Sequence, residues 1–234
     1  RHIVMELVDG VDGFDLLEAA GRLPPDTVAL IALEVARGLE HAHLRGIVHR
    51  DIKPSNVFIS RRGEVKLMDF GIARDPANSE LTQIGLSVGT PAYMAPEQIR
   101  GEAIDGRTDL FAVGIVLYEL LTGAPPWPEG KGRNVALDVL RAPPPPLAER
   151  CPSAPEALVA IVDRCLEKAP ERRWSSAHAL RQALEALVHA RVPVDPRGRL
   201  VLDLEARGFV TPEAARRLVP PELRGPGRGQ PPRA

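Results

Sequence analysis

The chain has 234 residues, of which 44% are hydrophobic, and a net charge of −1 with a pI near 6.7. This composition suffices for one sizeable core, and it gives no electrostatic footprint for nucleic acid or an anionic membrane. Cys151 and Cys165 fit no metal-ligand spacing and are expected to be buried thiols, which suits a cytoplasmic protein. No apolar run approaches the ~18 residues that a membrane helix needs, and no signal-peptide pattern begins the chain.

Hydrophobic spacing predicts a mainly helical domain with a few short strands. Short apolar runs bounded by turn residues predict strands at residues 3–8, 47–48, 57–59 and 65–68. Helical spacing predicts helices at residues 14–20, from 24–26 to Gly46, and at 110–121, 135–140, 157–166, 177–188 and 210–218. The helix at 110–121 is apolar all round, which is typical of a helix buried on every side.

Two stretches carry no such periodicity. Residues 69–97 are rich in Gly, Ser, Thr and Pro, and loops of this length inside a compact domain are usually functional. From Pro193 onward the pattern fades, so we expect a loosely packed or disordered extension. Its last residues, 225–234, are rich in Pro, Gly and Arg and are expected to be disordered.

Three motifs carry chemistry. Residues 47–56 read Ile-Val-His-Arg-Asp-Ile-Lys-Pro-Ser-Asn, so a carboxylate, an ammonium and a carboxamide share one polar loop. Asp69-Phe70-Gly71 directly follows a predicted strand. Residues 89–97 read Gly-Thr-Pro-Ala-Tyr-Met-Ala-Pro-Glu. The first two motifs match the catalytic-loop and metal-binding signatures of protein kinases.

Together these motifs resemble the large lobe of a serine/threonine protein kinase, and the chain is most similar to the eukaryotic-like (Hanks-type) kinases of bacteria. The resemblance implies a kinase-like C-lobe fold (α+β), with the hinge and C-lobe in residues 1–190 and a C-terminal extension in 191–234. No Gly-x-Gly-x-x-Gly loop and no Val-Ala-x-Lys strand precedes the hinge. The chain, which begins at Arg1, is therefore expected to be a fragment without the small lobe.

The resemblance implies roles for the polar residues of the site. Asp51 would accept the proton of the substrate hydroxyl, and Lys53 would neutralise the γ-phosphate of ATP. Asn56 and Asp69 would hold Mg²⁺, with Mn²⁺ as an alternative, because hard cations prefer oxygen ligands. Thr90 would shape the seat of the substrate Ser or Thr.

The same resemblance places the adenine of ATP against the first strand. The Glu6 carbonyl and the Val8 N–H would bond the adenine edge, and Phe58 would form part of the floor under the ring. Asp12 would face the ribose, with a plain turn carboxylate as the alternative interpretation.

Other residues are expected to support the site. Glu97 would form a buried ion pair with Arg173, although Ala169-Pro170 stands where the family usually has Asp-Pro. Asp109 would cap the buried helix and accept backbone N–H groups of the catalytic loop, and His49 is expected to be a packed imidazole rather than a base.

Arg50 beside the catalytic residue suggests control by phosphorylation of the activation segment. Thr82 is the preferred phosphosite and Ser87 a further candidate.

The resemblance thus implies a signalling enzyme that uses ATP and Mg²⁺ to phosphorylate protein Ser/Thr hydroxyls, with a homodimer as a route to autophosphorylation. The fragment alone is expected to bind ATP weakly. Two alternatives are a non-catalytic kinase-like scaffold and a truncated docking module. A small-molecule kinase of the aminoglycoside type is disfavoured, because those enzymes lack the Gly-Thr-x-x-Tyr-x-Ala-Pro-Glu segment.

Overall fold

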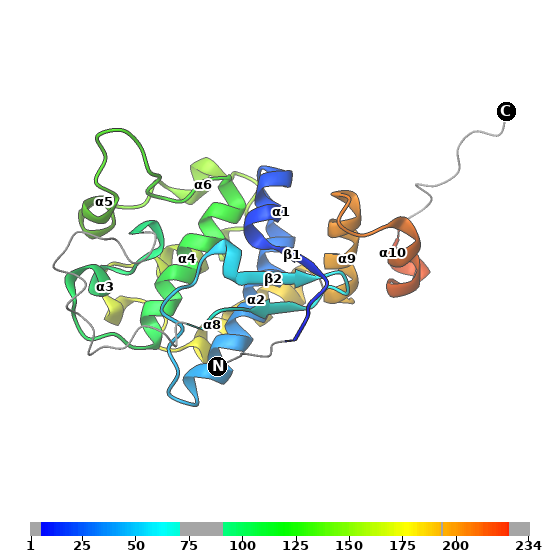
Figure 1. Cartoon of the computed structure of the whole chain (residues 1–234), viewed down its shortest axis with the longest axis horizontal. Coiled ribbons are helices and arrows are strands. Elements are labelled where there is room, and N and C mark those ends of the chain that lie inside the picture. Colours follow the sequence, from blue (N-terminus) through cyan, green and yellow to red (C-terminus); the bar gives the residue numbers. More distant parts are fainter. Residues whose placement is uncertain (1–5, 71–90, 193, 225–234) are drawn as a thin grey trace.

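The computed structural model describes residues 6–70, 91–192 and 194–224, which form helices around a small sheet (Figure 1). The mainly helical fold with few short strands is confirmed. In chain order the elements are β1 (Gly10–Asp12), α1 (Gly13–Ala20), α2 (Pro25–His43), the 3-10 helix η1 (Pro54–Asn56), β2 (Val57–Ser60), β3 (Val65–Leu67), η3 (Pro91–Tyr93), α3 (Pro96–Arg100), α4 (Gly106–Thr122), α5 (Val135–Arg141), α6 (Leu147–Arg150), α7 (Glu156–Cys165), η4 (Pro170–Arg172), α8 (Ala177–Arg191), α9 (Pro196–Ala206), α10 (Pro212–Leu218) and η5 (Pro221–Leu223).

The sheet is antiparallel, with the strands in the order β1-β2-β3. Ile59 of β2 pairs with Val11 on one side and Val65 on the other, and both Val11 and Ile59 are buried in the core. Successive side chains of a strand point to opposite faces. The neighbouring row, which pairs Phe58 with residues 12 and 66, therefore lies on the opposite face of the sheet.

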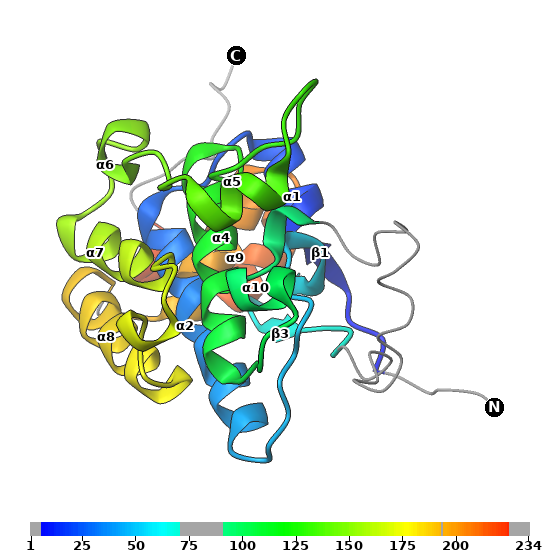
Figure 2. The ribbon, with the colours of Figure 1, turned by 90° about the vertical axis from the view of Figure 1, so that its left-hand side faces the viewer.

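Helix α4 lies at the centre of the helical layer, between the sheet side and the α7–α8 side (Figure 2). It contacts α2 and α7, while α2 also packs along α8. Buried residues run without a gap from Thr108 to Leu121. The buried central helix expected from its all-round apolar pattern is therefore confirmed.

Two strand predictions are wrong within the described residues. Residues 6–9 and 47–50 have no regular secondary structure, whereas β1 forms at Gly10–Asp12, beyond the end of the strand predicted at 3–8. A strand is defined by hydrogen bonds to a neighbouring strand, and residues 10–12 are the ones that pair with β2. A Cβ on Gly10 would lie 2.1 Å from the Ile59 carbonyl oxygen, so this close pairing requires glycine.

The expectation of a loosely packed C-terminal extension is also wrong for the described residues 194–224. Helices α9 and α10 lie at the end of the molecule opposite α3 and α5 (Figure 1). Buried side chains of these helices and of the residues next to α10 join the core: Leu200, Val201, Leu204, Val210, Ala215 and Val219. The sequence did carry start signals, because Asp195-Pro196 and Thr211-Pro212 each combine an N-cap residue with proline at the first helical position.

Both cysteines are buried and unbridged, as expected. Across the described residues, no helix combines the length and the apolar character that crossing a bilayer would require.

Candidate functional site

The loop after α2 is fixed to the start of α4 through Asp109, whose side chain is only 1% exposed. Its Oδ2 accepts the backbone N–H of His49 at 2.8 Å, and its Oδ1 accepts the backbone N–H of Arg50 at 2.8 Å. Arg50 has a φ of +68°, a conformation that non-glycine residues rarely adopt and that persists only where the surroundings impose it. Asp109 supplies two of those restraints.

Asp109 does not cap its helix, so that part of its expected role is wrong. Helix α4 begins at Gly106, and Asp105 is the N-cap residue, accepting the Arg107 N–H at 2.8 Å. Asp109 lies one turn further on, where the positive end of the helix dipole still favours a carboxylate. His43 at the end of α2 also bonds Asp109, with 2.8 Å between Nε2 and Oδ2. A Cβ on Gly106 would lie 2.6 Å from the His43 ring, so glycine makes this approach possible.

His49 is fully buried and connects the loop to the end of β3. Its Nε2 lies 2.9 Å from the Met68 carbonyl oxygen, and its Nδ1 accepts the Asp51 N–H at 3.3 Å. Burial lowers the pKa of His49, although the nearby Asp109 carboxylate acts to raise it. A neutral imidazole that carries its proton on Nε2 satisfies both contacts. His49 is thus a packed imidazole with no exposed face for base chemistry.

The carboxylate, ammonium and carboxamide of the loop lie together. Lys53 Nζ is 3.2 Å from Asp51 Oδ2. The Asn56 amide donates to the Asp51 carbonyl at 2.7 Å and to Asp51 Oδ2 at 3.3 Å. Because the nitrogen of Asn56 is turned to Asp51, its amide oxygen is the atom left to face a cation.

Asp69 lies two residues after the end of β3. The Met68 N–H donates to the Asn56 carbonyl at 2.9 Å, so the residue before Asp69 is tied to the other expected metal ligand. Asp69 is exposed and has a φ of +53°, while the next ring, Phe70, packs 4.5 Å from His49 between centroids. A carboxylate and an amide oxygen suit Mg²⁺, which proteins hold through one or two carboxylates with substrate phosphates supplying other oxygens.

Two of the expected nucleotide-binding residues, Asp12 and Phe58, lie on the outer face of the sheet. Asp12 and Phe58 are cross-strand partners, and Phe58 pairs in turn with Lys66. Lys66 Nζ binds the Glu6 carboxylate at 2.6 Å, which brings residue 6 to the same face. Val8 lies between Glu6 and β1 in a segment without regular structure.

Asp12 has a local role in the structure. Its Oδ1 accepts the N–H groups of Phe14 and Asp15, both at 2.9 Å, and so caps α1. This is the alternative interpretation of a turn carboxylate. The ribose contact stays a prediction.

Several expected residues lie outside the described residues: Thr82, Ser87 and Thr90. The structure resumes at Pro91, and the end of this segment is anchored at α3. Gln98 Oε1 accepts the Ala95 N–H at 2.9 Å, and its Nε2 donates to the Arg50 carbonyl at 3.2 Å. Gln98 therefore joins α3 to the residue beside Asp51.

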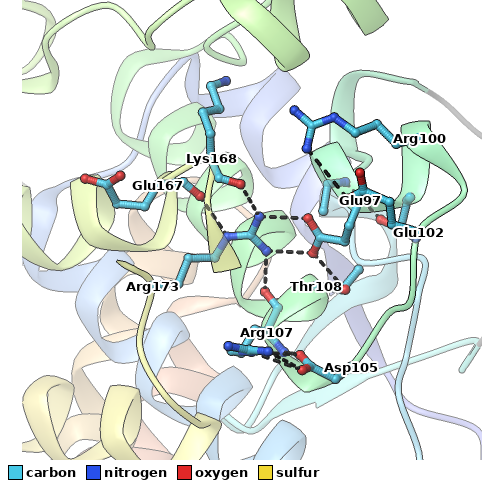
Figure 3. Close-up of polar contacts among 11 residues, drawn as sticks. Glu97, Arg100, Glu102, Asp105, Arg107, Thr108, Glu167, Lys168 and Arg173 are labelled. Atoms are coloured by element: carbon cyan, nitrogen blue, oxygen red, sulfur yellow. Dashed lines mark hydrogen bonds and ion pairs between the residues drawn. The ribbon is translucent and has the colours of Figure 1, made fainter. Parts of the chain in front are cut away.

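The ion pair expected between Glu97 and Arg173 is present and fully buried (Figure 3). Two parallel hydrogen bonds join the guanidinium to the carboxylate at 2.7 and 2.8 Å. The remaining guanidinium N–H groups donate to three carbonyl oxygens at 2.8–3.0 Å, those of Arg107, Glu167 and Lys168. Every donor of the guanidinium thus has a partner.

The carboxylate of this pair is equally well held. Thr108 donates its hydroxyl to Glu97 Oε1 at 2.8 Å. Burial acts to raise the pKa of the Glu97 carboxyl, but the hydrogen bonds from Arg173, the backbone and Thr108, together with the Arg173 charge, outweigh it and hold that pKa below its usual value. The pair fastens α3, and with it the segment that begins at Pro91, to α4 and η4.

A further buried carboxylate, Glu119 of α4, was not singled out from the sequence. It is 8% exposed and accepts the Tyr93 hydroxyl at 2.7 Å. Burial raises the pKa of Glu119, against the Tyr93 hydrogen bond, which acts to lower it. The sequence signal available was a glutamate inside an otherwise apolar helix.

Glu119→Gln is expected to stabilise the protein at pH 8. A carboxyl whose folded pKa exceeds its unfolded pKa holds its proton longer in the native state, so its contribution to stability falls as pH rises through that interval. The amide keeps an acceptor for Tyr93 and carries no charge. Thermal unfolding at pH 8 should give a higher Tm than the wild type, with the gap narrowing near pH 4.5. Glu213→Gln on the exposed face of α10 is the control, and a variant less stable than wild type at pH 8 would contradict the argument.

Comparisons with known proteins agree with this geometry. A family profile described as "Protein kinase domain" matches residues 1–184. The serine/threonine-protein kinase PknB of Mycobacterium leprae is 39% identical over 197 residues, covering 84% of this chain and 32% of the relative. The serine/threonine-protein kinase Pkn1 of Myxococcus xanthus is 41% identical over 204 residues, covering 84% and 29%.

Solved structures of protein kinase domains also match this chain. The crystal structure of the Mycobacterium tuberculosis PknI kinase domain matches with a TM-score of 0.60 and 30% sequence identity, covering 78% of this chain and 64% of that chain. The chain spans about a third of the length of the curated relatives it matches, 32% and 29% in the two cases above.

Proposed function

The chain belongs to the protein kinase family, and from this premise we propose that it forms the hinge and large lobe of a serine/threonine protein kinase. In this proposal the whole protein transfers the γ-phosphate of ATP to Ser or Thr hydroxyls of protein substrates in a signalling pathway. The observation that carries the proposal is the cluster of Asp51, Lys53 and Asn56, held together within 3.3 Å.

The proposed mechanism assigns each polar group one task. Asp51 orients the substrate hydroxyl and accepts its proton as the oxygen attacks. Lys53, which is paired with Asp51, would neutralise charge on the transferred phosphoryl group. The oxygens of Asn56 and Asp69 would hold Mg²⁺, or Mn²⁺ as a substitute, and the bound ion supplies charge neutralisation on the phosphates. Thr90 shapes the seat of the target residue.

The nucleotide would lie against the outer face of the sheet. The main-chain groups of Glu6 and Val8 would bond the adenine edge, Phe58 would form the floor and Asp12 would face the ribose. The register that sets Asp12 opposite Phe58 supports this assignment. Residues 1–190 would form the hinge and C-lobe, and 191–234 a C-terminal extension. We further propose a cytoplasmic location and a homodimer that permits autophosphorylation.

Thr82→Ala is expected to lower the activity of the full-length protein strongly. A phosphate on Thr82 would pair with Arg50, whose backbone is held by Asp109 beside the catalytic residue, and so would order the activation segment. Phosphopeptide mapping and initial rates of substrate phosphorylation measure the effect, with Ser79→Ala as the matched control. A Thr82→Ala protein as active as the wild type would show that Thr82 is not the regulatory phosphosite.

The experiment that tests the proposed function uses the protein translated from its complete reading frame. With Mg²⁺ and radiolabelled ATP, we expect incorporation of phosphate on Ser or Thr of the protein itself and of added protein substrate. Omission of the divalent ion should abolish incorporation. A protein that binds nucleotide but transfers no phosphate would favour a kinase-like scaffold instead.

A further inference from the structure

The turn between β2 and β3 rests on the first turn of α9. Gly63 in this turn has a φ of +73°, and a Cβ built on it would lie 2.4 Å from the Arg197 carbonyl oxygen and 3.1 Å from its carbonyl carbon. No side chain fits into so short a distance. The turn and the C-terminal extension therefore touch through their backbones.

The hairpin between these strands is short and tightly closed. Gly63 N–H donates to the Ser60 carbonyl at 2.9 Å, and the Ser60 hydroxyl accepts the N–H groups of Arg62 and Glu64 at 3.2 and 3.1 Å. A strand rises about 3.3 Å per residue, so β2 separates this turn from its far end by only about 13 Å. At that far end lie Asn56 and Asp69. A shift of the closed end is thus carried to both expected metal ligands.

Helix α9 is itself firmly held. Leu200, Val201 and Leu204 are buried against the core, and the Thr27 hydroxyl of α2 bonds the Asp203 carboxylate. Asp195 caps the helix by accepting the Gly198 N–H at 2.9 Å. Helix α10 packs against α9. The extension is therefore held firmly against the core at the place where the hairpin turn contacts it.

We propose that α9 and α10 form a brace that positions the β2–β3 hairpin, and through it Asn56 and Asp69, with Gly63 and Leu200 as positioning residues. The protein kinase profile ends at residue 184, so the brace lies outside the part of the chain that this profile matches. The inference deepens the proposed function and rests on it, because it takes Asn56 and Asp69 to be metal ligands.

Gly63→Ala tests the contact, with Gly101→Ala as its matched control. Both glycines have a left-handed φ, +73° and +69°, so alanine costs a similar backbone strain at each. Around Gly101, however, no atom lies within 4 Å of the added Cβ. Amide hydrogen exchange of β2 and β3 is expected to quicken by about tenfold in Gly63→Ala and to stay at the wild-type rate in Gly101→Ala.

Leu200→Ala loosens the brace without altering the hairpin. Leu158→Ala is its control, because Leu158 is equally buried but lies on α7, which packs against α4, α6 and α8. Both variants lose a buried leucine side chain. Only Leu200→Ala should speed exchange in the hairpin under native conditions. The proposed brace is wrong if amide exchange in the hairpin is equally fast in Gly63→Ala and Gly101→Ala, and equally fast in Leu200→Ala and Leu158→Ala.

Binding of Mn²⁺ with ADP, followed by electron paramagnetic resonance, tests the effect on the metal site. We expect Gly63→Ala to weaken Mn²⁺–ADP binding by about tenfold, as for losses of outer-shell support. A loosened hairpin with unchanged Mn²⁺–ADP affinity overturns the positioning role. The binding is measured on the full-length protein. If its wild-type form binds no Mn²⁺–ADP, the proposed function loses its metal site and the positioning role fails with it, whereas the exchange experiment still decides whether α9 holds the hairpin.

Discussion

Phosphoryl transfer by the full-length protein is expected to fall about 10²–10⁴-fold when Asp51 is replaced by Asn. The Asp51 carboxylate is the proposed acceptor of the substrate proton, and a carboxamide of the same shape cannot take that proton. Initial rates of autophosphorylation and of substrate phosphorylation with Mg²⁺ and ATP measure the loss. Nucleotide affinity should change little, because in the proposed mechanism Asp51 contacts the hydroxyl rather than the adenine.

The loop around Asp51 should keep its structure in this variant. The Asn56 amide donates to the main-chain carbonyl of residue 51, and His49 Nδ1 accepts its main-chain N–H. Neither bond depends on the carboxylate. Asp163→Asn, on the exposed side of α7, is the matched control and should leave the rate unchanged. An Asp51→Asn enzyme that retains its rate within about threefold would remove Asp51 from the mechanism.

The long helices of this chain could be predicted because their signals are local. The expected helix at 177–188 and the observed α8, Ala177–Arg191, begin at the same residue, where Ser176 provides an N-cap. Strands β2 and β3 were also predicted, at residues 57–59 and 65–68, but β1 was not, because its pairing depends on residues far away in the sequence. Gly10 joins the sheet through a backbone approach to Ile59 that no periodicity near residue 10 records.

In the candidate site, too, some contacts could be predicted from sequence motifs and others depend on residues far apart in the chain. The contacts of Asp109 and Glu97 with the expected partners could be predicted from the motifs, because these residues stand at fixed places in a recognisable pattern. The N-cap could not be assigned to Asp105 by that route, since two carboxylates four positions apart both suit the start of α4. The contacts of His43 with Asp109 in α4, and of Glu119 with Tyr93 in η3, form only because the fold brings these distant residues together.

Removing one partner of the buried Glu97–Arg173 pair should destabilise the fold more than the other stability changes considered above. Glu97→Gln or Arg173→Met leaves the other charge buried without its counterion, which costs about 3–5 kcal/mol in the free energy of unfolding. For a chain of this size the fall in Tm is roughly 6–20 °C. Thermal unfolding followed by circular dichroism measures it. Glu213→Gln removes one side of an exposed ion pair, and its cost should stay below about 1 kcal/mol.

The double variant Glu97→Gln/Arg173→Met separates the value of the pair from the cost of breaking it. With both charges gone, no uncompensated charge remains buried, so the double variant should be more stable than the sum of the two single losses predicts. Additive losses would show that the three carbonyl bonds of Arg173 matter more than its ion pair.

The pH dependence of unfolding is an independent test of the Glu97–Arg173 pair. A carboxyl whose folded pKa lies below its unfolded pKa contributes stability above the unfolded pKa, and that stability is lost as pH falls through the folded pKa. Glu97 is such a group. The gap between wild type and Glu97→Gln should therefore be full at neutral pH and shrink below about pH 4.5, the ordinary value for glutamate. The sign of this gap is opposite to the one expected for Glu119→Gln, which should be more stable than the wild type at high pH, so Glu97 and Glu119 can be told apart in one set of unfolding curves.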